Sequence, residues 1–227
     1  MFWMTTALAE EAAEAAEKAE PGWWETMVEK FSEVTPQSWI VLGVLVVLGV
    51  ILLAIHGTAR KWSARMIAFG GLCIALSYIL SCIRLYRMPQ GGSVTPGSML
   101  PLMLFAAAFG VGPGLLAGAV YGLLQYLQGG WFLNIWQFLL DYVLAYAALG
   151  ITGLAKHWKG KWGLYAAMLI AAVCRAVSAT LAGILFWETA PWASLVYNGT
   201  YLIPETVICI VLAILVAPPV MKTMKTV

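Results

Sequence analysis

Three charged residues interrupt long apolar stretches of this chain: Asp141, Arg175 and Glu205. A single charge at the centre of a membrane helix costs at least about 2.5–3.5 kcal/mol, so such a residue needs a partner or a polar cavity. At about 1.5 Å per helical residue, each of the three lies roughly 15–18 Å below the outer end of its predicted helix. Three charges at one depth can meet. If Arg175 neutralises one carboxylate, the other is free to bind a cationic ligand.

Other roles for these charges stay open, namely a purely structural Arg–Glu–Asp cluster and a proton relay. The chain has two histidines, His56 and His157, and both fall at span ends near the cytoplasm. No Ser/His or paired-Asp motif is present, so we do not expect an intramembrane enzyme or catalytic residues. No zinc-like Cys/His spacing and no GxxxxGK[ST] motif occur, so we expect no metal, no cofactor and no ATPase activity in this chain.

Polar and aromatic residues share helix faces with the three charges. Residues three and four apart lie on one face of a helix. Tryptophan rings attract cations through their quadrupole, by about 0.5–2 kcal/mol each. Carboxylate, amide and tryptophan groups together fit an aromatic, hydrogen-bonding cation. The residues are Trp131, Asn134, Gln137 or Phe138, and Asp141 on the segment 131–154; Arg175, Ala179, Gly183 and Trp187 on 163–187; and Ser194, Asn198, Tyr201 and Glu205 on 193–217.

The elements that position these residues are membrane helices. The 227 residues are 62% hydrophobic and 11% charged, with a mean hydropathy of +0.85, far from ordinary soluble usage. A bilayer core of about 30 Å needs about 20 apolar residues per helix. We therefore predict an all-α membrane protein with a six-helix core at 65–217 and one extra N-terminal transmembrane helix at 38–56. The apolar segments are 38–56, 66–86, 98–109, 111–128, 131–154, 163–187 and 193–217.

Charge is divided unevenly along the chain. Eight of the 11 acidic residues precede residue 34, so 1–37 reads as an acidic extracytoplasmic segment. The basic segments 60–65, 156–162 and 221–225 are expected in the cytoplasm by the positive-inside rule. This places the C-terminal tail, 218–227, inside and the N-terminus outside the plasma membrane of a bacterial cell. The expected partners are a small molecule, membrane lipid and other membrane subunits, and no nucleic acid.

Several ordered motifs resemble a known family over about residues 65–217. They are RMPQGGSVTPGSMLPL, GLLAGAVYGLLQ, LLDYVLAYAALGITGLA and SLVYNGTY. Together they are similar to the thiamine-specific substrate-binding subunits (ThiT) of energy-coupling factor (ECF) transporters. The resemblance implies a six-helix fold with an outward-facing thiamine pocket. It also implies docking onto an energising module of one transmembrane coupling protein and two ATPases, which drives uptake.

The resemblance also assigns roles to single residues. Asp141 stands where the family commonly has Glu. Separately from the resemblance, the charges at one depth lead us to expect that Arg175 and Glu205 form a supporting ion pair beneath the site. Small residues in the first family helix contact the coupling protein, although internal packing would also explain their spacing. The implied substrate-binding residues are Trp131, Asp141, Tyr142, Gly183, Trp187, Ser194 and Asn198, and the docking residues are Ala64, Ala68, Gly71 and Ala75.

The sequence departs from the family pattern at the predicted pocket. Ala179 and Ala193 replace a pocket His and a pocket Tyr, and GGSVTPG replaces a Trp-containing loop. A thiamine precursor or analogue is therefore an alternative ligand. A stand-alone proton-coupled carrier of an organic cation, using Asp141 and Glu205, is a further alternative. Six core helices without an inverted repeat argue against that carrier.

Overall fold

The computed structural model describes residues 63–158, 160 and 162–226, without the side chains of residues 225 and 226. The predicted acidic segment at 1–37 and the predicted extra helix at 38–56 lie outside the described residues. Nearly all of the predicted core, 65–217, lies within them. The full count of six core helices plus one therefore stays a prediction.

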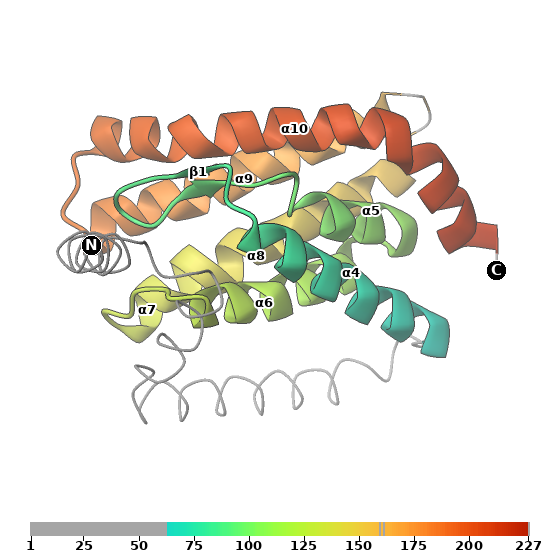
Figure 1. Ribbon diagram of the computed structural model, residues 1–227, viewed down its shortest axis with the longest axis horizontal. Helices are drawn as coiled ribbons and strands as arrows, with labels where there is room; N and C mark the ends of the chain where they lie inside the picture. The colour runs from blue at the N-terminus through green and yellow to red at the C-terminus, as the bar shows by residue number, and fades with distance from the viewer. Residues whose placement is uncertain (1–62, 159, 161, 227) are drawn as a thin grey trace, which may run out of the picture.

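The described chain is almost entirely helical (Figure 1). A short antiparallel hairpin, in which Tyr86 pairs with Val94, is the exception. The segment from Ile135 to Lys156 is one continuous helical run whose turns change from α to π and then to 3₁₀. In order, the elements are α4 (Ala64–Cys82), β1 (Tyr86–Arg87), β2 (Ser93–Val94), α5 (Leu100–Phe109), α6 (Val111–Leu127), α7 (Ile135–Phe138), the π-helix η2 (Leu139–Leu144), α8 (Ala145–Ala147), the 3₁₀-helix η3 (Ala148–Lys156), α9 (Gly163–Phe186) and α10 (Pro191–Thr226).

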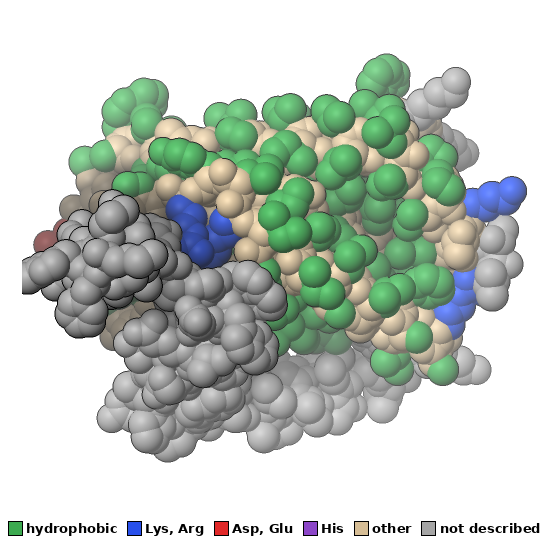
Figure 2. All heavy atoms as spheres, in the orientation of Figure 1, with side chains coloured by type: hydrophobic (Ala, Val, Ile, Leu, Met, Phe, Trp, Pro, Cys, Tyr) green, Lys and Arg blue, Asp and Glu red, His purple; other side chains and the backbone are tan. Residues whose placement is uncertain are grey.

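Four helices of the described chain are long and apolar enough to cross a membrane, which confirms the predicted helical membrane class. They are Ala64–Cys82, Ile135–Lys156, Gly163–Phe186 and Pro191–Met224. Two shorter apolar helices, α5 and α6, are separated only by Gly110, whose φ of 104° favours glycine. Hydrophobic side chains are spread over the described part of the face drawn in Figure 2, and Lys and Arg gather near the C-terminal end and beside the hairpin.

The last helix is longer than the sequence predicted. We expected a span at 193–217 followed by a separate tail, but α10 continues through Pro218 and Pro219 to Thr226. Ala213, Ala217 and Met224 are buried on the inner face of this helix, so the packed face extends past the prolines. Packing of that face keeps the segment helical despite the lost backbone donors.

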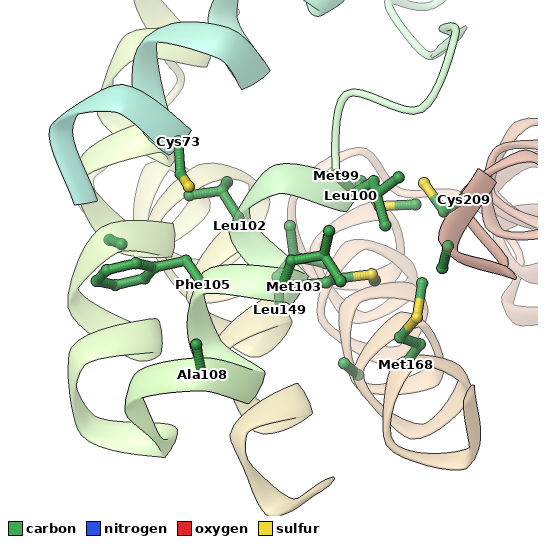
Figure 3. Packing of buried hydrophobic residues seen from close by; sticks show 14 of the residues in the cluster. Cys73, Met99, Leu100, Leu102, Met103, Phe105, Ala108, Leu149, Met168 and Cys209 are labelled. Carbon is green, nitrogen blue, oxygen red and sulfur yellow. The ribbon is translucent and has the colours of Figure 1, made fainter. Parts of the chain in front are cut away.

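Helix α5 forms the centre of the bundle. All of its residues from Leu100 to Ala108 are buried, and it contacts α4, α6, η3 and α10. Figure 3 shows Leu102, Met103 and Phe105 projecting from it into the surrounding helices. In a membrane, close packing of such side chains rather than removal of apolar surface from water holds the helices together.

Glycines bring α6 directly against the helix that carries Asp141. Gly114, Gly118 and Gly122 are spaced four residues apart and share one face. A Cβ atom at Gly118 would strike the backbone oxygen of Tyr146, and one at Gly122 would strike that of Tyr142. Small residues at this spacing allow two membrane helices to approach backbone to backbone. The contact therefore fixes the position of the π-helical segment.

Candidate functional site

Asp141 lies in the π-helix η2, within the run Ile135–Lys156. Single π-helical turns inside α-helices are frequent at functional sites. The first turn is capped by Asn134, whose side chain accepts a hydrogen bond from the backbone of Gln137 (2.9 Å). Gln137 is fully buried. The cap and the π turn together set the direction in which the Asp141 carboxylate points.

One oxygen of the Asp141 carboxylate is held by the protein. Its Oδ2 accepts hydrogen bonds from the Gln137 side chain (2.6 Å) and from the Trp187 indole nitrogen (3.2 Å). The second oxygen, Oδ1, accepts no hydrogen bond from the described residues. The side chain is only half-buried. The carboxylate is thus oriented through one oxygen while the other stays available to a ligand.

Trp187, which donates to this carboxylate, lies beside a second aromatic ring. The rings of Trp131 and Trp187 meet edge to face, with centroids 6.4 Å apart. Trp131 is 64% exposed and Trp187 is 39% exposed, so both present surface that a ligand could cover. The Tyr142 hydroxyl accepts a hydrogen bond from the backbone N–H of Trp131 (2.9 Å). The structure therefore brings together four predicted site residues: Trp131, Asp141, Tyr142 and Trp187.

The other predicted binding residues form a second group between α9 and α10. A Cβ atom at Gly183 would overlap the Ser194 hydroxyl, which donates to the Thr180 backbone carbonyl (3.0 Å). The Asn198 side chain donates to the backbone oxygen of Ser194 (2.9 Å) and accepts from the Tyr201 hydroxyl (2.7 Å).

Arg175 and Glu205 are not brought into the direct ion pair that we predicted. The Arg175 guanidinium lies over the Tyr146 ring, 4.2 Å from its centroid, and donates to the Met99 sulfur (2.6 Å). Glu205 is 2% exposed and accepts hydrogen bonds from Thr95 and Ser98 instead. Hydroxyl and backbone donors from the loop before α5 thus satisfy the carboxylate.

Tyr146, on whose ring the Arg175 guanidinium lies, belongs to the helical run that carries Asp141. Its hydroxyl donates to Gln125 on α6 (3.4 Å). The expectation that the three charges meet stays a prediction, since the contacts of Arg175 and Glu205 are with other residues. In the described part of the chain, no three His, Cys, Asp or Glu side chains gather where they could hold a metal ion.

The four small residues of α4 lie on its outer surface. Ala64, Ala68, Gly71 and Ala75 are all exposed, and a Cβ atom at Gly71 would meet open space. It is the neighbouring Gly70 that packs inward, since a Cβ there would lie 3.3 Å from the Phe105 ring. The stripe is therefore available for contact, and internal packing among the described helices does not account for it.

Several residues of this region were missed by the sequence reading. Thr95 and Ser98 hold Glu205, and Gly92 lies against Tyr201. Thr and Ser just before an apolar helix are typical capping residues, which was the available signal. At the two positions that depart from the family pattern, Ala179 is half-buried and Ala193 is exposed.

Comparison with known proteins places the chain in a family. The family model described as "Thiamine transporter protein" matches residues 67–225. The chain belongs to the thiamine transporter family. This is a family of transporters rather than of enzymes, and its members are multi-pass membrane proteins, in agreement with the helices found here.

Two relatives illustrate the similarity. The thiamine transporter ThiT of Bacillus subtilis (strain 168) is 36% identical over 160 residues, which cover 61% of this chain and 83% of the relative. A solved structure of ThiT from Listeria monocytogenes matches with a TM-score of 0.60 at 24% identity, covering 69% of this chain and 96% of that one. The second match supports the fold.

Proposed function

We propose that this chain is the substrate-binding membrane subunit of an ECF-type importer and binds thiamine from outside the cell. Family membership supports the ligand class, and the Asp141 carboxylate carries the assignment. It is oriented through Oδ2 by Gln137 and Trp187, it is flanked by exposed tryptophan rings, and its Oδ1 is open. These features suit a cation with flat aromatic rings and an amino donor, as thiamine has.

The proposed binding residues would then contact different parts of the ligand. Asp141 accepts a hydrogen bond from the aminopyrimidine or balances the thiazolium charge, and charge-assisted hydrogen bonds are the stronger ones. Trp187 stacks on a ring, and Trp131 covers the ligand from the exposed side. Tyr142 holds the Trp131 backbone in place. Gly183 of α9 leaves room for Ser194, which with Asn198 would supply polar contacts from α10.

Transport would depend on a separate energising module of a coupling protein and two ATPases. The exposed small-residue stripe of α4, at Ala64, Ala68, Gly71 and Ala75, supports a docking role, because small side chains let another helix approach closely in the membrane. The proposed topology keeps the basic C-terminal end in the cytoplasm of a bacterial cell and the N-terminus outside.

A thiamine precursor or analogue is the second candidate ligand. Ala179 lies one turn before Gly183 and is half-buried, so a His-sized volume is missing on that face. A ligand with extra bulk at this position would fill it. The stand-alone proton carrier has weaker support, because the Glu205 carboxylate is already engaged by three hydrogen bonds.

Thiamine titration of the purified full chain in detergent, followed by intrinsic tryptophan fluorescence, tests the proposal. We expect saturable quenching that persists in Trp192→Phe, because Trp192 is 74% exposed and is not placed in the site. Quenching should shrink in Trp187→Phe. If thiamine gives no quenching with folded wild-type protein, the thiamine assignment fails, and saturation by a pyrimidine or thiazole precursor would favour the second candidate.

A further inference from the structure

The hairpin formed by β1 and β2 lies along α10 (Figure 1). Two of its backbone N–H groups, those of Gln90 and Gly92, donate to the Tyr197 hydroxyl (3.2 and 3.4 Å). Within the hairpin, Met88 donates to the Gly92 carbonyl (2.7 Å). The loop is therefore attached to α10 through its backbone, by a side chain one turn before Tyr201.

Gly92 sits directly on the ring of Tyr201. A Cβ atom at this position would lie 2.6 Å from the Tyr201 Cδ1 atom, so only glycine permits the observed approach. The Tyr201 hydroxyl in turn donates to the Asn198 Oδ1 atom (2.7 Å). Tyr201 is thus placed between the hairpin and Asn198, which is one of the proposed thiamine contacts.

Glu205 fastens the other end of this loop. Its Oε2 accepts from the Thr95 backbone N–H, and its Oε1 accepts from the Thr95 and Ser98 hydroxyls. The Thr95 hydroxyl also accepts from the Ser98 N–H (3.1 Å), in the turn that leads into α5. A negative charge just before a helix N-terminus is favourable. In Figure 3, Met99 and Leu100, which follow this turn, lie beside Cys209 of α10.

We infer that Glu205 is a positioning residue for ligand binding. Its three hydrogen bonds fix the 92–98 segment on α10, which keeps Gly92 against Tyr201 and thereby keeps Tyr201 bonded to Asn198. Glu205 does not touch the ligand in this account. The inference rests on the proposed function only through Asn198, because the hairpin attachment itself needs no ligand.

Hydrogen exchange of the full, ligand-free chain in detergent tests the attachment. Glu205→Met keeps the side-chain length but leaves the Thr95 N–H and two hydroxyls without an acceptor, so exchange at Gly92 and Thr95 should become at least about tenfold faster. Glu205→Gln retains one oxygen acceptor and should restore most of the protection. Thr95→Val should loosen the same segment, whereas Thr95→Ser keeps the hydroxyl and should not. Unchanged exchange in both Glu205→Met and Thr95→Val would overturn the inference.

Thiamine affinity tests the link to the ligand. Glu205→Met should weaken thiamine binding by about tenfold in the wild-type background. In a Tyr201→Phe background, where the hydrogen bond from the Tyr201 hydroxyl to Asn198 is already lost, it should weaken binding by much less. A general loss of stability would weaken binding equally in both backgrounds, which would contradict the inference. If wild-type protein binds thiamine and Glu205→Met binds it equally well, the inference fails while the proposed function stands. If the wild type does not bind thiamine, the proposed function fails, and the exchange data alone decide whether Glu205 holds the hairpin.

Discussion

Asp141 and Glu205 are both intramembrane carboxylates, yet their surroundings differ in kind. Asp141 is half-buried beside exposed tryptophans, and both of its protein hydrogen bonds end on one oxygen. Glu205 is 2% exposed, and three hydrogen bonds occupy both of its oxygens. The comparison teaches that depth and charge alone do not identify a ligand-binding carboxylate. On the proposed function, the acceptor capacity that the protein leaves unused distinguishes the two carboxylates.

Neutralising Asp141 should have the largest effect on ligand binding. Asp141→Asn keeps the shape of the side chain but replaces one carboxylate oxygen by an NH2 group and removes the charge, so a charge-assisted hydrogen bond to the ligand is lost. We expect thiamine affinity to fall about 100-fold, as measured by isothermal titration calorimetry. An affinity unchanged within about threefold would show that Asp141 does not contact the ligand.

The tryptophan that orients Asp141 should come next. Trp187→Phe keeps an aromatic ring but removes the indole N–H that donates to Asp141 Oδ2. We expect thiamine affinity to fall about tenfold, with Trp192→Phe as the matched control. Equal losses in the two variants would mean that any tryptophan near the membrane surface has the same influence.

The equivalent neutral substitution at Glu205 should have a much smaller effect. Glu205→Gln retains an oxygen for the Thr95 N–H and can donate to the neighbouring hydroxyls, so the hairpin stays attached. We expect thiamine affinity to change by less than about threefold. A loss as large as that of Asp141→Asn would remove the distinction between the two carboxylates.

Changes on the α4 stripe should leave ligand affinity unaltered. Gly71→Leu adds a side chain where a Cβ atom meets open space, and Gly71 is not one of the proposed binding residues. We expect full thiamine affinity but loss of ATP-dependent uptake in cells that contain the energising module, since a bulky residue blocks close helix contact. Normal uptake by this variant would argue against docking through the stripe.

The sequence identified the candidate site residues better than it identified their contacts. Helical spacing predicted that Asn134 and Asp141 share one helix and that Trp187 lies at the end of the next; Asn134 caps the helix that carries Asp141, and Trp187 donates to Asp141. Their role in ligand binding stays a prediction. The π turn at Asp141 was not foreseen, because it lies where Gly122 of α6 packs against the Tyr142 backbone. That contact joins segments distant in the chain.

The direct Arg175–Glu205 pair illustrates the same limit. Opposite charges at one depth favoured an ion pair, but the choice of partner depended on where the loop before α5 folds. Thr95 and Ser98 are more than 100 residues from Glu205 in sequence, so no local pattern connects them. Their donors satisfied Glu205 and left Arg175 on the Tyr146 ring.

An experimental structure of the full chain with thiamine bound tests the central claim most directly. The account predicts an amino or thiazolium group of the ligand next to Asp141 Oδ1, with any hydrogen bond at about 2.7–3.2 Å, and Glu205 still bonded to Thr95 and Ser98. Thiamine bound away from Asp141, or in direct contact with Glu205, would contradict it.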